Sequence, residues 1–496
     1  MLGEVERMSG KGRKAPDMAQ RGLGLEMAAP GRSAAIGDPP EELFLPADRD
    51  DLFFGEERLE DYLGSKGGRW VLRLRELLRG LEYAQFYPRY SCKGRKALHP
   101  RTLLGLLVYG ILMRRSSLRE LEWLACSDLG AMLLSGGHQP DHSTIGKFIN
   151  LHRELLAEDF FVNLVNYLAR RLHLPVGVTA ADGTVIEAAT SYRRLRQEAA
   201  HSADPETNPP EDPPPPAPDA PPPDGVRQPL KSGLWRPAYK PSVLTNAALI
   251  VGQRVEYSSE RAALWPMLEQ HERALGAAPS ALLLDAGYMG IELLTGLVER
   301  EINVLCPSGR TNAPDWQRRQ SGAYFDKREF VYEPQHDSYR CPAGRELHFD
   351  YRAPDRRGRR FVRYRGAQCG DCQLRAQCTA SPAGRTLRRY AGEEIKEAMA
   401  EVLRQPGARR EYRRRKVLVE PVFARLRGLQ RLDRFRRRGL GAVRAEFALH
   451  CIAYNLRVAA RLVLSRFLII ITRAGAEQPS QPFAILWLAL LSIDSD

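Results

Sequence analysis

The chain has 496 residues, 43% of them hydrophobic, and a formal net charge of +14. This length and composition suit two or three folded domains, which excludes a small disulfide framework and a wholly disordered chain. No stretch up to residue 465 is apolar for long enough to span a bilayer, and the later FLIII and FAILWLALLSI are too short. We therefore expect a cytoplasmic protein without a membrane partner.

The N-terminal third divides into a leader and a helical region. Residues 1–45 are rich in Gly, Pro, Ala and charge, and we expect them to be disordered. From 46 to 172, apolar residues recur three and four positions apart, as in RTLLGLLVYGILMRR, which predicts helices. Asp141 and Ser143 mark a helix start before TIGKFINLH. This region is either a helix-turn-helix that binds DNA or a helical bundle without a ligand.

Two strand-like segments follow, and each carries an aspartate. Asp182 lies within VGVTAADGTVIEAAT, and Asp285 ends the short apolar run of ALLLDAGYMG. The Asp285 carboxylate either caps the next helix or takes part in a reaction. Residues 202–229, rich in proline, predict an exposed loop. Residues 279–306 follow a strand, helix, strand pattern, which indicates an α/β fold.

Four cysteines lie close together in the sequence: Cys341, Cys369, Cys372 and Cys378. Their thiolates could hold a structural zinc ion, and Cys369 with Cys372 forms a CxxC half-site, but the other half is imperfect. A plain cluster of reduced thiols is the alternative, and a redox pair is less favoured. The basic segment YRAPDRRGRRFVRYRG lies among them. We expect the other four, Cys92, Cys126, Cys306 and Cys451, to be small buried hydrophobic residues.

Residues 404–444 hold most of the net charge. Fifteen Arg or Lys residues stand there against three acidic ones, which gives +12 of the +14. A solvated face is the common meaning of a charge run, but this density of arginine favours a polyanion such as nucleic acid. Glu420 lies among these arginines in a helical pattern. Pro421 after it predicts either a kink or the start of a new helix.

Together these motifs resemble the bacterial insertion-sequence transposases of the DDE, RNase H-like type, over about residues 85–460. The resemblance rests on ADGTVIEA, LLLDAGYMG, RRKVLVEPVFARLRG and RFRRRGLGAVRAEFALHCIAYNL, with HPRTLLGLLVYGIL and DHSTIGKF upstream. It implies that Asp182, Asp285 and Glu420 bind Mg²⁺ or Mn²⁺ for cleavage of DNA at element ends and for strand transfer into target DNA. Glu446 is a less favoured third ligand.

The resemblance also implies contacts with DNA. Lys416 and Arg427 stand at the family's intervals from Glu420, whereas Arg413 occupies the place of the family's tyrosine, beside Tyr412. The expected partners are the terminal inverted repeats and target DNA, bound by a homo-oligomer at the nucleoid. The expected DNA-binding residues are Arg413, Arg414, Arg415, Lys416, Arg427, Arg436, Arg437 and Arg438.

We therefore expect an α/β protein whose RNase H-like mixed sheet is flanked by helices and interrupted by an insertion. A catalytically inactive DNA-binding remnant or regulator is the main rival, and a nuclease that cuts without joining is another. The expected parts are a leader (1–45), an all-α DNA-binding domain (46–172), the two halves of the core (173–300 and 386–465), the basic cysteine-containing insertion (301–385) and an irregular tail (466–496).

Overall fold

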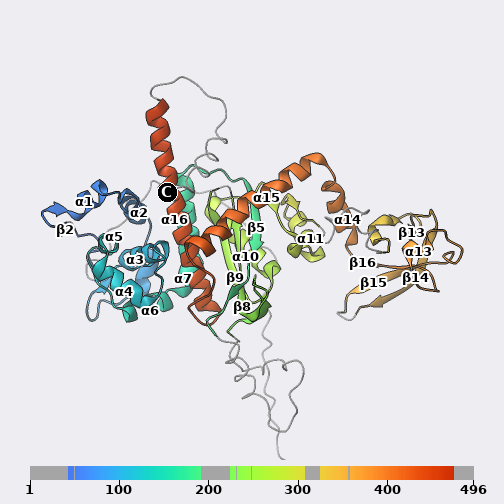
Figure 1. Cartoon of the computed structure of the whole chain (residues 1–496), viewed down its shortest axis with the longest axis horizontal. Coiled ribbons are helices and arrows are strands. Elements are labelled where there is room, and N and C mark those ends of the chain that lie inside the picture. The colour runs from blue at the N-terminus through green and yellow to red at the C-terminus, as the bar shows by residue number, and fades with distance from the viewer. Residues whose placement is uncertain are drawn as a thin grey trace, which may run out of the picture. The chain divides into compact units, whose positions relative to one another are not determined.

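The computed structural model describes residues 43–49, 51–190, 224–230, 232–246, 248–307, 324–355 and 358–473, with side chains to 462 (Figure 1). All of them belong to one compact unit, Pro40–Asp496. Nearly all of the expected leader, most of the proline-rich stretch and the end of the tail lie outside the described residues. The expected domain boundaries stay predictions.

The region after the leader is mainly helical. Its helix α6 begins at His142, and the Asp141 side chain accepts a hydrogen bond from the Thr144 N–H at 2.6 Å, as the predicted helix start requires. Two short strand pairs also occur, β1 (Phe44–Leu45) with β4 (Ala97–Leu98) and β2 (Phe53–Phe54) with β3 (Glu57–Arg58), so the region is not purely helical. The other helices are α1 (Leu59–Ser65), α2 (Arg69–Arg79), α3 (Pro100–Leu112), α4 (Leu118–Ser127), α5 (Leu129–Leu134), α7 (Arg153–Ala157) and α8 (Asp159–Arg171).

A mixed sheet forms the centre, which confirms the α/β class. The strands lie in the order β9-β8-β5-β10-β11, and the short β6 (Ile186–Glu187) and β7 (Val226–Pro229) also pair with β8. The contacts of β8 with β5 and β9 are antiparallel, and those of β10 with β5 and β11 are parallel. The five strands are β5 (Val178–Gly183), β8 (Trp235–Thr245), β9 (Ile250–Glu256), β10 (Ala281–Leu283) and β11 (Val304–Leu305).

Helices cover this sheet from several parts of the chain. Helix α10 (Glu260–Leu275) packs on β8 and β9, and α11 (Ile291–Glu299) connects β10 to β11. The long α16 (Leu440–Arg473) contacts β9 and several N-terminal helices, and it extends beyond residue 466, where we expected an irregular tail. The Asn455 side chain of α16 accepts a hydrogen bond from the Ile250 N–H at 2.9 Å and donates one to the Ile250 carbonyl at 2.8 Å. The C-terminal helix thus satisfies backbone groups at the start of strand β9.

Helix α15 (Pro406–Ala424) carries six of the fifteen basic residues of 404–444 and lies against β5. It begins at Pro406, where a proline is well suited to the first helical position, and it continues through Pro421. A new helix start at Pro421 is therefore wrong. The ring nitrogen of Pro421 cannot donate to the carbonyl of Val417, and a π-helical turn, η4 (Arg425–Leu429), follows directly.

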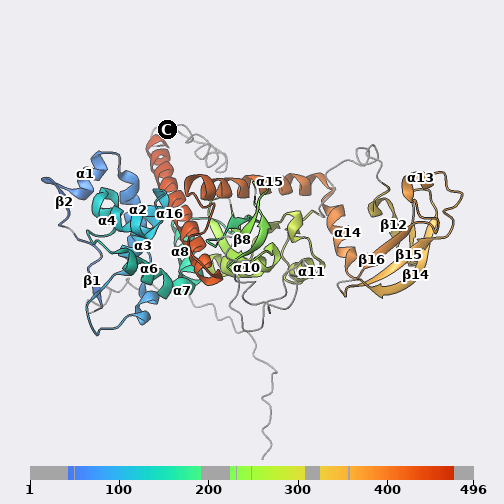
Figure 2. The ribbon, with the colours of Figure 1, turned by 60° about the horizontal axis from the view of Figure 1, so that its bottom comes forward.

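The insertion forms an antiparallel sheet with its own small core (Figure 2). Sequence patterns indicated a basic, cysteine-containing segment but not these strands. Its core consists of Phe325, Phe330, Tyr339, Leu347, Tyr364 and Leu387. The elements are η3 (Lys327–Glu329), β12 (Val331–Glu333), β13 (Ser338–Arg340), β14 (Glu346–Pro354), β15 (Arg360–Gly366), α13 (Arg375–Cys378) and β16 (Thr386–Tyr390), followed by α14 (Glu393–Val402).

The four cysteines that are not part of the expected zinc cluster differ in burial. Cys306 and Cys451 are buried, as expected, but Cys92 and Cys126 are exposed, so the prediction is wrong for these two. Of the helices that the structure describes, none is long and apolar enough to cross a membrane.

Candidate metal-binding site

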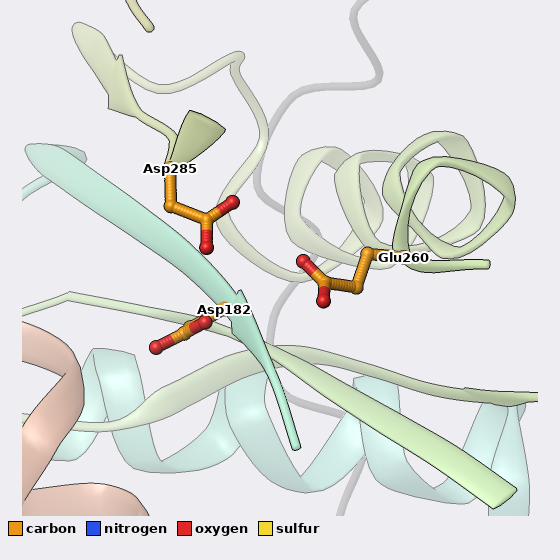
Figure 3. Close-up of side chains that lie close together, drawn as sticks. All are labelled: Asp182, Glu260 and Asp285. Atoms are coloured by element: carbon orange, nitrogen blue, oxygen red, sulfur yellow. The ribbon is translucent and has the colours of Figure 1, made fainter. Parts of the chain in front are cut away.

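Three carboxylates from separate elements converge beside the central sheet (Figure 3). Asp182 lies near the end of β5, Glu260 is the first residue of α10, and Asp285 follows β10. Each offers one oxygen, and these oxygens all lie within 4.8 Å of one another. Among the described residues, no other group of His, Cys, Asp or Glu side chains is as close.

The strand register brings the two aspartates together. In the parallel pair of β5 and β10, Ala180 stands opposite Leu283, and each aspartate follows two residues later. The N–H of Gly183 donates to Asp182 Oδ1 at 2.9 Å, and the N–H of Gly287 donates to Asp285 Oδ1 at 2.9 Å. Asp285 caps the short turn η2 (Ala286–Tyr288), and its carboxylate also faces the other two, while its part in a reaction stays a prediction.

Glu260 reaches the aspartates because two glycines leave room for it. A Cβ atom at Gly183 would lie 2.8 Å from Glu260 Cγ, and one at Gly287 would lie 3.0 Å from Glu260 Oε2. One carboxylate oxygen of Glu260 pairs with Lys240. The other, Oε2, is buried and has no hydrogen-bond partner among the described residues. An unpartnered buried carboxylate oxygen is costly unless a cation completes it.

The environment of the site changes the pKa of Asp182. Burial raises the pKa of Asp182 to about 6, the nearby charge of Arg415 opposes the rise, and the charges of Asp285 and Glu260 add to it. Burial likewise raises the pKa of Tyr288 well above its ordinary value, so its hydroxyl stays neutral. The site therefore disfavours a second and third negative charge unless a cation offsets them.

Arg415 of α15 supplies a positive charge to two of the three acids. Its Nη2 lies 3.1 Å from Asp182 Oδ1 and 3.6 Å from Asp285 Oδ2. The guanidinium is largely buried, with 14% of its side chain exposed. We expected Arg415 to bind DNA phosphates; in this structure it is paired with the aspartates.

Glu420, the expected third ligand, lies outside this group and is exposed on α15. Five residues separate it from Arg415, which places it about 140° around the helix. Arg427, about two turns further on, donates to Thr184 Oγ1 at 2.7 Å and to the Val185 carbonyl. The structure thus brings Asp182 and Asp285 together with Glu260, while the assignment of Glu420 stays a prediction.

Glu446 has a different role from the one considered for it. The residue is buried, and its carboxylate accepts hydrogen bonds from the backbone N–H groups of Arg436, at 3.0 and 3.1 Å, and Arg437, at 2.9 Å. It is absent from the group of converging carboxylates. These contacts tie the loop before α16 to that helix.

The other expected DNA-binding residues differ in exposure. Arg413, Lys416, Arg436 and Arg438 are exposed. Arg414 is also exposed and pairs with Glu411 at 2.6 Å, whereas Arg437 is partly buried, with its guanidinium 3.4 Å from Asn150 Oδ1. Their contacts with DNA stay a prediction. The four cysteines of the insertion lie together around a separate small cavity.

Two segments of the chain match models of known families. Residues 340–460 match a family described as a transposase DDE domain, and residues 65–151 match a family described as a transposase domain. No curated protein matches the chain. Glu420 lies inside the first matched segment, whereas Asp182, Glu260 and Asp285 lie outside both.

Proposed function

The two family matches support a DDE-type insertion-sequence transposase, and from that premise we propose that the chain cleaves DNA at the ends of its element and joins them to target DNA. The reaction is a phosphoryl transfer that depends on divalent metal ions. The observation that carries the proposal is the convergence of Asp182, Glu260 and Asp285.

The residues fit a hard divalent cation such as Mg²⁺ or Mn²⁺. All three ligands are carboxylates, the type that these ions prefer. The buried oxygen of Glu260 has no partner among the described residues, and Arg415 already places a cation against both aspartates. When bound, the ions activate the attacking oxygen and stabilise the leaving oxygen.

The chain's own groups prepare this site. The N–H groups of Gly183 and Gly287 fix the two aspartates on adjacent strands, so their oxygens need little reorganisation to bind a cation. Lys240 holds Glu260 through its other oxygen. Arg427 holds the chain just beyond Asp182 through Thr184 and Val185. These contacts keep the acids in place while DNA enters.

The strand order supports an RNase H-like core for this sheet. Three antiparallel strands, β9, β8 and β5, continue into the parallel β10 and β11, and both aspartates lie at one edge of the central parallel pair. A helix after β9 supplies Glu260, and α15 crosses β5 from beyond the insertion. This arrangement places acids from distant segments around one point.

We assign the third carboxylate of this site to Glu260 and keep Glu420 as the ligand of a second ion. Glu420 is exposed on α15 and belongs to the matched DDE segment. The exposed arginines and Lys416 of α15 bind the phosphates of the terminal repeats and of target DNA. The active form is a homo-oligomer on DNA, in the cytoplasm at the nucleoid.

The test is cleavage and joining of DNA that carries the element's own ends, with Mg²⁺ or Mn²⁺. Wild type is compared with Asp182→Asn, Asp285→Asn, Glu260→Gln and Glu420→Gln. The matched control is Glu269→Gln, an exposed glutamate of α10 that lies outside the carboxylate group. DNA binding is measured for every variant, so that a loss of chemistry is separated from a loss of affinity.

We expect both aspartate variants and Glu260→Gln to lose cleavage and joining while they still bind DNA. If Glu260→Gln stays active and Glu420→Gln does not, Glu420 is the third ligand and our assignment is wrong. An active Asp182→Asn would refute the mechanism. If wild type binds the ends but cuts nothing, it is an inactive DNA-binding remnant or regulator. If it cuts but cannot join pre-cut ends, it is a nuclease.

A further inference from the structure

The four cysteines of the insertion surround one small cavity, of about 20 Å³. Cys341 follows β13, Cys369 and Cys372 follow β15, and Cys378 ends α13. All four are free thiols of intermediate burial. A space of this size holds a single water molecule or ion.

Tight turns fix the cysteines around this cavity. The Cys341 N–H donates to the Arg345 carbonyl and the Gly344 N–H donates to the Cys341 carbonyl, both at 2.8 Å. Gly384 adopts a φ of +85°, and a Cβ there would lie 3.2 Å from Cys369 Sγ. The chain therefore gives up a side chain at this position to let two loops approach the sulfur.

The charges around the cavity suit a cluster of thiolates. Arg385 lines the cavity, and its guanidinium donates a hydrogen bond to the Cys378 carbonyl at 3.1 Å. Arg345 and Arg375 also line the cavity. These arginines are placed to offset the negative charge of ionised thiols around the cavity.

We propose that Cys341, Cys369, Cys372 and Cys378 bind one structural zinc ion. Zinc takes four thiolates in a tetrahedron with Zn–S distances of about 2.3 Å, so the sulfurs stand about 3.8 Å apart. Among the described residues, only the three carboxylates form a group whose ligand atoms all lie within 4.8 Å of one another. The four sulfurs are therefore further apart than in a zinc site, and binding of zinc draws them inward. Four protein ligands leave no open position, and the ion takes no part in DNA cleavage.

The insertion needs such an ion because its own core is small. Among the described residues, six hydrophobic side chains form its buried cluster, and small cores of this kind commonly depend on a metal or on disulfides. Zinc joins the β13–β14 turn, the loop after β15 and α13 into one unit. It therefore fixes the end of the sheet whose strands β14 and β15 carry the arginines of this segment.

The test uses the full-length protein, purified without chelator and assayed for zinc by mass spectrometry. We expect about one zinc per chain in wild type and in the control Cys92→Ser, which changes an exposed cysteine elsewhere. Cys372→Ser and Cys378→Ser lose the ion. Because the carboxylate site could also take zinc, wild type is reloaded with Co²⁺, whose charge-transfer absorption reveals sulfur ligands.

Wild type alone decides the outcome if the serine variants fail to fold. A cobalt-loaded wild type without sulfur-to-cobalt absorption would overturn the proposal. Zinc that stays bound after all four cysteines of the insertion have been alkylated would also overturn it, because the ion would then lie elsewhere. Recovery of a disulfide between Cys369 and Cys372 from protein prepared without oxidant, with no zinc, identifies a redox pair instead.

Discussion

Replacement of Arg415 by glutamine should strengthen the binding of a divalent ion to the carboxylate site. Arg415 Nη2 lies 3.1 Å from Asp182 Oδ1 and 3.6 Å from Asp285 Oδ2. A metal ion that uses these oxygens competes with the guanidinium for them. Glutamine keeps much of the side chain's length and polarity but removes its charge.

The size of the effect follows from the distances. An ion about 2 Å from Asp182 Oδ1 would lie about 5 Å from a guanidinium that stays in place, given the 3.1 Å contact. Between charges of +1 and +2 at that distance, repulsion is about 1–2 kcal/mol even at the dielectric constant of water, or roughly tenfold in Kd. We therefore expect Arg415→Gln to bind Mn²⁺ about tenfold more tightly at pH 8.

The pH dependence of the increase in Mn²⁺ affinity separates competition by Arg415 from other causes. Arg415 lowers the pKa of Asp182, which burial raises to about 6. Without Arg415 the pKa of Asp182 rises further, so protons compete better with the metal in the variant. The advantage of Arg415→Gln should be largest at pH 8 and should shrink as the pH falls toward 6.

The assay is isothermal titration of metal-free protein with Mn²⁺ at both pH values. Arg410→Gln is the matched control, because Arg410 is exposed on the same helix and its loss changes the net charge equally. If Arg415→Gln binds Mn²⁺ no more tightly than wild type and Arg410→Gln at pH 8, Arg415 does not compete with the metal and the reasoning is wrong.

Three further predictions concern other residues of the site and the basic helix. The pKa of Asp182 is about 6 in the folded protein against an ordinary 3.8, so folding favours the protonated carboxyl group. This group therefore stabilises the folded protein at a pH below 3.8, and that contribution is lost as the pH rises through 6. Asp182→Asn should therefore stabilise the metal-free protein by about 2–3 kcal/mol at pH 8 and little at pH 4; an equal rise in Tm at both would contradict this. Gly183→Ala places a Cβ 2.8 Å from Glu260 Cγ, so calorimetry should show roughly tenfold weaker Mn²⁺ binding, and unchanged affinity would mean that Glu260 is not a ligand. Arg413→Gln should lessen the slope of log DNA affinity against log salt by about 0.9 in fluorescence anisotropy; an unaltered slope removes Arg413 from the interface.

The sequence was sufficient to find both aspartates but not their partner. Asp182 and Asp285 stand out because each follows or ends an apolar strand at a glycine-containing turn, and parallel strands bring such ends together. Glu260 follows the N-cap Ser259 in the first turn of α10, where acidic residues are common for reasons unrelated to function. The one available signal was its place just after a strand, at the start of a helix that follows β9.

The side of α15 that faces the sheet also could not be predicted from the sequence. Sequence spacing placed Glu420, Lys416 and Arg427 on one side, and the structure puts Arg415, not Glu420, against the aspartates. The side that faces β5 is set by buried Leu418, Val419 and Val422, and by the π-helical turn after Pro421. The sheet of the insertion was missed although its strands alternate apolar and polar residues, as half-buried strands do, because the density of arginine was interpreted as a basic segment.

The hydrogen bonds between Asn455 and Ile250 have a consequence for synthesis on the ribosome. Strand β9 pairs only with β8 among the described strands, and the N–H and carbonyl of Ile250 at its start are satisfied by α16, about two hundred residues later. While translation proceeds, the nascent chain therefore carries unpaired backbone groups at the start of this strand. A transcript cut short before codon 455 would yield a product inclined to aggregate and to be degraded, so truncated copies of the gene would leave little stable protein.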